Sequence, residues 1–294
     1  MKNFILPNMY ENYKLNLKLL NLIEKHPECF IEDISIYAVY GNFQFCIWDG
    51  GRIFNQMHQA SKEIILDVLN QYMKYNVKIR FIFTNTSLQP IHYHNRFCNV
   101  LLDIAKEFPV ELVVNDDNLR DYIENKFPNK FSFISSTTRC LTNLNDVKNE
   151  LNNNNYLMTC LDYNLNKNPK IFEMPKELIE KTELLCNAIC APGCPYRKEH
   201  YRLNSIYNLQ YGKYYPMEGC KIKYNTLHPE TMQYKNNISP EEIINKYEPA
   251  GFQYFKLEGR TLPQIENICN YVRYLVRPEY QLFVINYLEN DTYK

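Results

Sequence analysis

Short apolar runs alternate along this chain with longer stretches in which apolar residues recur at helical spacing. The short runs predict β-strands at residues 4–6, 34–39, 79–83, 110–114, 131–135, 156–161, 183–189 and 253–257. The longer stretches predict helices at residues 12–24, 59–72, 95–106, 118–125, 146–151, 176–181, 240–247 and 263–276. Strands and helices therefore follow one another in regular order.

Two of the predicted helices also carry start signals. Ser239 stands before Pro240, which resembles an N-cap followed by proline at the first helical position. Thr261 followed by Pro263 gives a similar signal for the last predicted helix. Both signals agree with the helix starts that the apolar pattern predicts.

The order of these elements indicates the fold class. Repeated strand–helix units favour an α/β protein with a parallel sheet, and eight such units favour a (β/α)8 TIM-type barrel. An open, doubly wound sheet is the alternative. We expect one barrel domain over residues 1–294, with a cysteine-bearing excursion at about residues 186–235 after the seventh strand.

The composition of the chain limits the classes of partner that it can bind. Lysine plus arginine and aspartate plus glutamate both number 33, so the formal net charge is +0. This balance excludes a bulk positive field that draws proteins onto nucleic acid, although a local basic groove stays open. No run approaches the roughly 20 apolar residues that span a bilayer, and the first residues lack the apolar core of a secretory signal. We expect a soluble, cytoplasmic protein that does not bind membranes.

The cysteines point to the functional centre. Ten cysteines in a cytosolic chain are better explained as thiols and metal ligands than as disulfides. If residues 186–190 are extended, the sulfurs of Cys186 and Cys190 lie roughly 13 Å apart. We therefore place Cys186 inside the barrel or in a second layer around the ligands. The turn at 191–193 lets Cys194 reach the same ion as Cys190, and Cys220 can supply a third thiolate.

Thiolates ligate both iron–sulfur clusters and zinc, and the spacing does not separate the two. The order Cys-x-x-x-Cys-x-x-x-Cys is not the Cys-x-x-x-Cys-x-x-Cys of radical-SAM enzymes, so we set that class aside. Reduced thiols that bind nothing are the remaining interpretation.

Two motifs carry a resemblance to a known family. Cys186-Asn-Ala-Ile-Cys190, followed by Cys194, and the later string Lys256-Leu-Glu258-Gly-Arg260 resemble the collagenase-like peptidases, unassigned peptidase family 32. In that family an H-G-A-x-C strand end is followed by a further cysteine, and a K-I-E-G-R strand end closes the barrel.

The resemblance implies an eight-stranded barrel. In several members it also implies a four-cysteine iron–sulfur cluster used in oxygen-independent hydroxylation of RNA bases or a quinone precursor. Residue by residue, Cys190, Cys194 and Cys220 match cluster ligands, so a [4Fe-4S] cluster is the expected cofactor and zinc is the alternative. The string from Lys256 to Arg260 matches the later motif.

The chain also departs from the family. Cys186 stands where the family often has histidine, and no cysteine lies between Cys220 and Lys256, where a fourth ligand is expected. The open alternatives are an iron left free to bind substrate, a changed or lost metal, or a fourth ligand from Cys186, His200, His228 or Cys269. Because few residues follow Arg260, we expect no room here for the family's additional C-terminal domain.

Lys256, Glu258 and Arg260 alternate along the last predicted strand, so they face the barrel interior and its mouth. We expect them to be catalytic, with Glu258 as acid or base and Arg260 as an anion clamp. A structural ion network among the three is the alternative.

Three further segments invite a simpler interpretation. Residues 195–202 form a basic, tyrosine-containing stretch that suits a phosphate or a stacked base, or a solvated helix face. His92 and His94 have the spacing of metal ligands but no evident third partner, so we expect a surface pair. The glycines of the turn at 48–52 suit a tight loop near the barrel mouth.

Three functions remain open at this point. The first is an iron–sulfur enzyme that hydroxylates an RNA base or a small molecule. The second is a peptidase or other hydrolase that uses zinc or a reactive cysteine. The third is a non-catalytic barrel that binds a protein or RNA partner through the stretch after Cys194.

Overall fold

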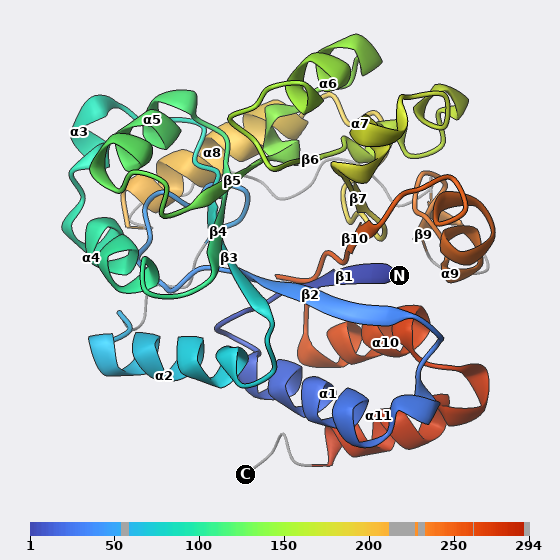
Figure 1. Cartoon of the computed structure of the whole chain (residues 1–294). Helices are drawn as coiled ribbons and strands as arrows, with labels where there is room; N and C mark the ends of the chain where they lie inside the picture. Colours follow the sequence, from blue (N-terminus) through green and yellow to red (C-terminus); the bar gives the residue numbers. More distant parts are fainter. Residues whose placement is uncertain (54–58, 212–226, 229–232, 261, 291–294) are drawn as a thin grey trace.

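The computed structural model describes residues 1–53, 59–211, 227–228, 233–260 and 262–290. Its parallel strands close into a barrel in the order β1-β10-β7-β6-β5-β4-β3-β2 (Figure 1). The barrel strands are β1 (Lys2–Leu6), β2 (Ile34–Gly41), β3 (Lys78–Phe83), β4 (Val110–Val114), β5 (Ser132–Ser135), β6 (Met158–Cys160), β7 (Thr182–Leu185) and β10 (Tyr254–Lys256). Phe4 of β1 lies opposite Phe255 of β10, so the sheet has no free edge. The predicted (β/α)8 barrel is confirmed, and the doubly wound alternative is wrong.

Helices surround this barrel (Figure 1). They are α1 (Tyr13–Lys25), α2 (Lys62–Met73), α3 (Pro90–Tyr93), α4 (Arg96–Ala105), α5 (Asp117–Lys126), α6 (Leu144–Leu151), α7 (Lys176–Glu180), α8 (Arg197–Leu209), α9 (Pro240–Glu242), α10 (Gln264–Leu275) and α11 (Gln281–Glu289). A π-helical turn over Ile243–Tyr247 continues α9, and a short hairpin pairs β8 (Leu227–His228) with β9 (Gln233–Tyr234). Within the described residues, no helix is long and apolar enough to cross a bilayer.

The helix start at Ser239 is confirmed. Its hydroxyl accepts a hydrogen bond from the Glu242 backbone N–H at 3.2 Å, and the Glu242 carboxylate accepts one from the Ser239 N–H at 2.9 Å. This reciprocal arrangement is a capping box. Thr261, the other predicted signal, lies outside the described residues, and α10 has Pro263 as its N-cap.

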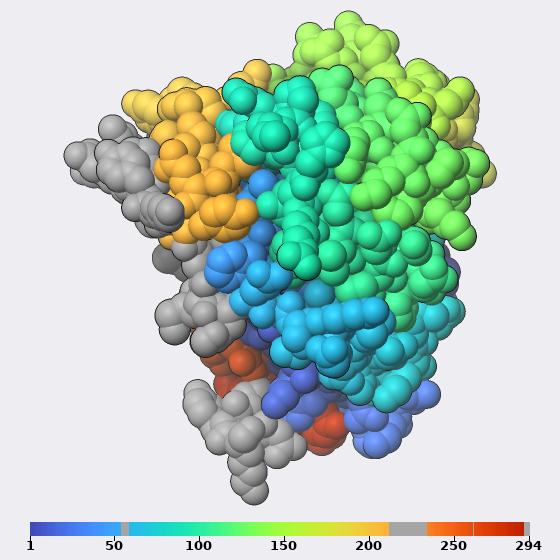
Figure 2. Space-filling view, turned by 90° about the vertical axis from the view of Figure 1, so that its left-hand side faces the viewer, coloured from blue at the N-terminus to red at the C-terminus, as the bar shows by residue number. Residues whose placement is uncertain are grey.

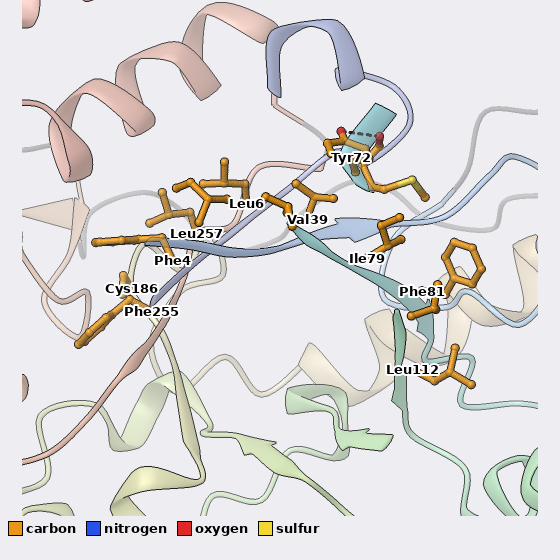
Figure 3. Packing of buried hydrophobic residues seen from close by; sticks show 14 of the residues in the cluster. Phe4, Leu6, Val39, Tyr72, Ile79, Phe81, Leu112, Cys186, Phe255 and Leu257 are labelled. Atoms are coloured by element: carbon orange, nitrogen blue, oxygen red, sulfur yellow. Dashed lines mark hydrogen bonds between the residues drawn. The ribbon is translucent and has the colours of Figure 1, made fainter. Parts of the chain in front are cut away.

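The main apolar core lies between the strands and the surrounding helices. Phe4, Ile79, Leu112 and Phe255 belong to it, and Figure 3 shows them on the outer side of the barrel wall. Cys186 lies in the same layer and is fully buried. In β7, which precedes Cys186, Glu183 lies in the barrel interior and Leu185 lines the barrel mouth. Because side chains alternate along a strand, Cys186 faces away from the interior, and its expected place inside the barrel is wrong.

The barrel interior combines a small apolar cluster with buried charges. Ile5, Ala38, Tyr40, Ile82, Val113, Ile134 and Met158 form the cluster. Below it, the fully buried Arg80 pairs with Glu111 at 2.7 Å and with Glu183. Lys256 contacts the other oxygen of Glu183 at 3.2 Å. The interior charges are therefore paired, which offsets much of the cost of removing them from water.

Candidate functional site

A hollow of about 500 Å³ opens at the barrel mouth, the end at which the strands finish. Its lining includes residues at the ends of several different strands or in the loops that follow them: Gly51, Arg52, Thr84, Ser136, Thr137, Thr138, Leu185, Lys256, Glu258 and Arg260. Tyr40 and Ile82 form part of its floor inside the barrel, and Tyr201 of α8 completes the lining. The βα loops of such barrels commonly carry the chemistry, because they converge on this face.

Glu258 is held in place by the loop after β2 and by the loop after β7. Its carboxylate pairs with Arg52, from the loop after β2, and accepts a hydrogen bond from the Ile189 backbone N–H at 2.9 Å. The backbone of Glu258 also exchanges two hydrogen bonds with the side chain of Asn187, at 2.9 and 2.6 Å. These contacts draw the chain after β7 away from the sheet. The strand predicted for residues 183–189 therefore ends at Leu185.

Arg260 has a different partner. Its guanidinium donates to Asp49 Oδ2 at 2.6 Å. Burial is the largest single influence and lowers the pKa of Arg260, but Asp49, Tyr40 and Glu11 together raise it by more, so the net direction is upward and the side chain stays charged. Arg260 is thus a permanent cation at the mouth, available to orient an anionic group.

Lys256 lies deeper, where the mouth meets the interior network. Its ammonium lies 4.3 Å above the ring of Tyr40 in addition to its contact with Glu183. Burial raises the pKa of Glu183, but Lys256 and Arg80 lower it further, to about 2. The structure therefore brings Lys256, Glu258 and Arg260 to one cavity, but each pairs with a residue outside the predicted triad rather than with the other two.

The turn at 48–52 contributes more than the sequence indicated, because it supplies both Asp49 and Arg52. Gly50 packs so closely on Asn85 and Ser205 that a Cβ atom there would overlap both. Gly51 faces the hollow, and its N–H donates to Thr84 Oγ1 at 3.2 Å. The pair of glycines followed by arginine was the available signal, but it did not indicate which residues the turn would meet.

Helix α8 covers one side of the mouth. Its buried residues are polar or aromatic-polar: Arg197, Tyr201, Asn204, Ser205 and Asn208. Asn208 donates to the carbonyl oxygens of Asp49 and Arg52 at 2.6 and 2.9 Å, and the Ser205 hydroxyl accepts from the Thr86 N–H at 2.9 Å. Figure 2 shows α8, in gold, beside the blue and teal segments that carry these loops.

The first turn of α8 is fixed by a buried ion pair. Arg197 donates to Asp162 at 2.5 Å and to the Thr137 carbonyl and hydroxyl at 3.0 Å each, and its guanidinium lies 4.2 Å from the centre of the Tyr163 ring. The predicted basic stretch at 195–202 is therefore partly structural. Tyr201 is the member of that stretch that lines the hollow.

Comparisons with known proteins bear on this arrangement. No protein-family model matches the sequence, and no curated protein matches it. Among solved structures, the U32 peptidase Mk0906 superposes with a TM-score of 0.54 and 12% sequence identity, over 90% of this chain and 95% of that one. The chain has the barrel fold of a U32 peptidase. The fold implied by the resemblance is thus confirmed.

In this barrel, Cys190 and Cys194 lie in the loop after β7, and both are half-buried free thiols. Cys190 packs against the small cluster of Cys160, Tyr163, Leu185 and Ala188. Cys220 lies outside the described residues. Among the residues that are described, no group of three His, Cys, Asp or Glu side chains is arranged to hold a metal ion.

The histidine pair also has a local explanation. His92 accepts a hydrogen bond from the Gln89 N–H at 2.9 Å, so it caps the short helix α3. His94 is exposed, and its ring lies 5.6 Å from that of Tyr122. The two side chains therefore have separate contacts on this surface.

Proposed function

We propose that this chain is an enzyme of the collagenase-like U32 family and that its reaction takes place at the barrel mouth. The observation that carries the proposal is the convergence of Glu258, Arg52 and Arg260 on one hollow at the carboxyl ends of the strands. The reaction we propose is a redox modification of the hydroxylation type, acting on an RNA base or a small molecule.

The residues at the mouth have complementary roles in this proposal. Glu258 is the acid or base, because its carboxylate faces the hollow and is oriented by Arg52 and by the Ile189 N–H. Arg260 binds an anionic group of the substrate. Lys256 supplies positive charge from below. The hollow is concave and combines apolar residues with a few charged ones, an arrangement that suits a small ligand rather than a folded partner.

Cys190, Cys194 and Cys220 are the proposed ligands of the cofactor. Cys190 and Cys194 fit this role because they are free and half-buried, and because their loop is hydrogen-bonded to Glu258 through Ile189. An iron–sulfur cluster bound there would supply one-electron transfer beside the hollow. Zinc on the same thiolates would instead supply a Lewis acid for hydrolysis.

Metal analysis after anaerobic purification tests the proposal. We expect iron and acid-labile sulfide in the protein, with a visible absorption band that oxygen bleaches. One equivalent of zinc, together with proteolysis that a chelator abolishes, would favour the hydrolase instead.

A colourless protein without iron, even after reconstitution, would end the iron–sulfur proposal. If zinc is also absent and the Cys190→Ser variant has the same biological effect as the unmodified protein, the chain is better described as a barrel that binds a partner without catalysis.

A further inference from the structure

A second hollow of about 430 Å³, here called the side chamber, lies next to the barrel mouth. Its lining includes Asn8, Met9, Tyr10, Glu11, Phe43 and Asp49. Arg52 and Arg260 line both the side chamber and the mouth, so they form the partition between the two hollows. A ligand in the side chamber would therefore lie against the proposed reaction site.

Two buried oxygen atoms of the side chamber lack a hydrogen-bond partner among the described residues. They are Asn8 Oδ1 and Asp49 Oδ1, in residues only 3% and 4% exposed. The Asn8 amide nitrogen donates to the Gly259 carbonyl at 2.9 Å, which leaves its oxygen as the free end. Buried acceptors are nearly always paired, so both atoms call for a donor that the protein does not supply.

The charged residues at the rim of the side chamber also favour a cationic ligand. Each of the partition arginines already has a carboxylate partner, Glu258 for Arg52 and Asp49 for Arg260. Within the described residues, Glu11 at the rim has no ion-pair partner. Burial against neighbouring protein atoms raises the pKa of Glu11. Arg260 lowers this pKa and the Asp49 carboxylate raises it, so the net direction is upward. A cation beside Glu11 would stabilise its charged form.

Aromatic rings complete the lining. The rings of Tyr10 and Phe43 lie 4.8 Å apart, tilted at 47° to each other, and both residues face the side chamber. Aromatic faces attract ammonium groups through their electron-rich centres. Unpaired acceptor oxygens, a carboxylate and aromatic rings together form the surroundings of a bound organic cation.

We propose that the side chamber binds the primary ammonium group of a small ligand, whose remaining part reaches past Arg52 and Arg260 into the mouth. The ammonium donates to Asn8 Oδ1 and Asp49 Oδ1, and Glu11 balances its charge. The inference rests on the proposed function only in identifying the mouth as the reaction site. The substrate class that follows is an amine-bearing small molecule.

Methyl NMR of the full chain tests this binding without turnover and without metal. Met9 is fully buried and lines the side chamber, and the chain has only 8 methionines, so its labelled methyl signal can be assigned with a Met9→Leu variant. The probe is butylamine at neutral pH, and 1-butanol is the uncharged control of the same length. We expect a saturable shift of the Met9 signal with the amine and little shift with the alcohol. Titration with alaninamide then separates a preference for alkyl amines from one for α-amino groups.

Two variants of the lining and one control variant test which residues hold the ammonium group. Glu11→Gln should weaken butylamine binding about threefold or more, whereas Glu24→Gln, at an exposed site of α1, should leave it unchanged. Asn8→Gly removes the free oxygen and should weaken binding about fivefold. The backbone of Asn8, with φ of 61°, already has a conformation that glycine favours.

Three results would overturn the proposal: no saturable shift, an equal response to 1-butanol, or unchanged affinity in Glu11→Gln. Thermal unfolding of each variant checks that it is folded, and Glu11→Gln alone decides if Asn8→Gly does not fold. These results are independent of the iron assay, so failure of the side-chamber proposal and failure of the proposed function can be told apart.

Discussion

Asp49 and Arg260 are 211 positions apart in the sequence, yet the Arg260 guanidinium donates to the Asp49 carboxylate at 2.6 Å. Asp49 follows β2 and Arg260 follows β10, and β1 lies between these strands in the closed sheet. The contact therefore depends on the strand pairing that closes the barrel. It also joins the mouth to the side chamber, because Arg260 lines both.

The two glycines of the turn at 48–52 should respond differently to the same change. Gly50→Ala should lower the free energy of unfolding by about 2 kcal/mol, because its methyl group would overlap the backbone of Asn85. Gly51→Ala should cost less, since its nearest contacts would be at 3.3 Å. Urea denaturation of both variants measures the difference. Equal destabilisation would contradict the packing described for this turn.

The buried Glu183 should make stability depend on acid pH. Its folded-state pKa, about 2, is below the ordinary value of 4.5, so its contribution is fully present above pH 4.5 and is lost as pH falls through about 2. Glu183→Gln should cost about 3–5 kcal/mol at neutral pH, because it leaves part of the charge of Arg80 unpaired. It should also flatten the pH dependence between those limits.

Urea denaturation at a series of pH values measures the effect of Glu183. Glu177→Gln, at an exposed position of α7, serves as the control and should leave neutral-pH stability unchanged. If Glu183→Gln were as stable as the unmodified protein at pH 7, the interior network would not be stabilising in the way we describe.

Cysteine substitutions should separate the proposed ligands from structural thiols. Cys190→Ser and Cys194→Ser should lower the iron content after anaerobic reconstitution. Cys186→Ala should not, because Cys186 faces the apolar layer and burial raises its thiol pKa well above the ordinary value. Cys269→Ser, at an exposed position of α10, is the surface control. Loss of iron in Cys186→Ala, with the fold intact by circular dichroism, would contradict our assignment.

Helix α8 should depend on side-chain hydrogen bonds for its docking. Asn208→Ala removes donors to the carbonyls of Asp49 and Arg52 and should cost about 1–3 kcal/mol. Hydrogen exchange of the Gly51 N–H should become faster in this variant. Lys198→Ala, on the exposed side of α8, should change stability by less than about 0.5 kcal/mol. Unchanged exchange at Gly51 in Asn208→Ala would show that α8 does not secure the turn.

The sequence alone predicted the order of the barrel strands and most of the helices, because apolar periodicity and capping are local properties of the chain, but it predicted no helix at α3, α8 or α11. The strand predicted at 110–114 is β4 with the same limits, and the helix start at Ser239 was visible from Ser239 and the Pro240 that follows it. The string from Lys256 to Arg260 also identified one side of the mouth, although β10 ends at Lys256, so Glu258 and Arg260 reach the mouth from the loop that follows and not by alternation on a strand.

Tertiary structure alone decided which residues meet. The partners of the predicted triad, Asp49, Arg52 and Glu183, come from distant parts of the chain, and only closure of the barrel brings them to Lys256, Glu258 and Arg260. Helix α8 has a largely polar buried face, so a search for apolar periodicity could not place it over the mouth. Side-chain hydrogen bonds from Asn187 likewise ended β7 early. Local pattern thus determined the barrel strands and most helices, whereas long-range pairing of charged and polar groups determined the site.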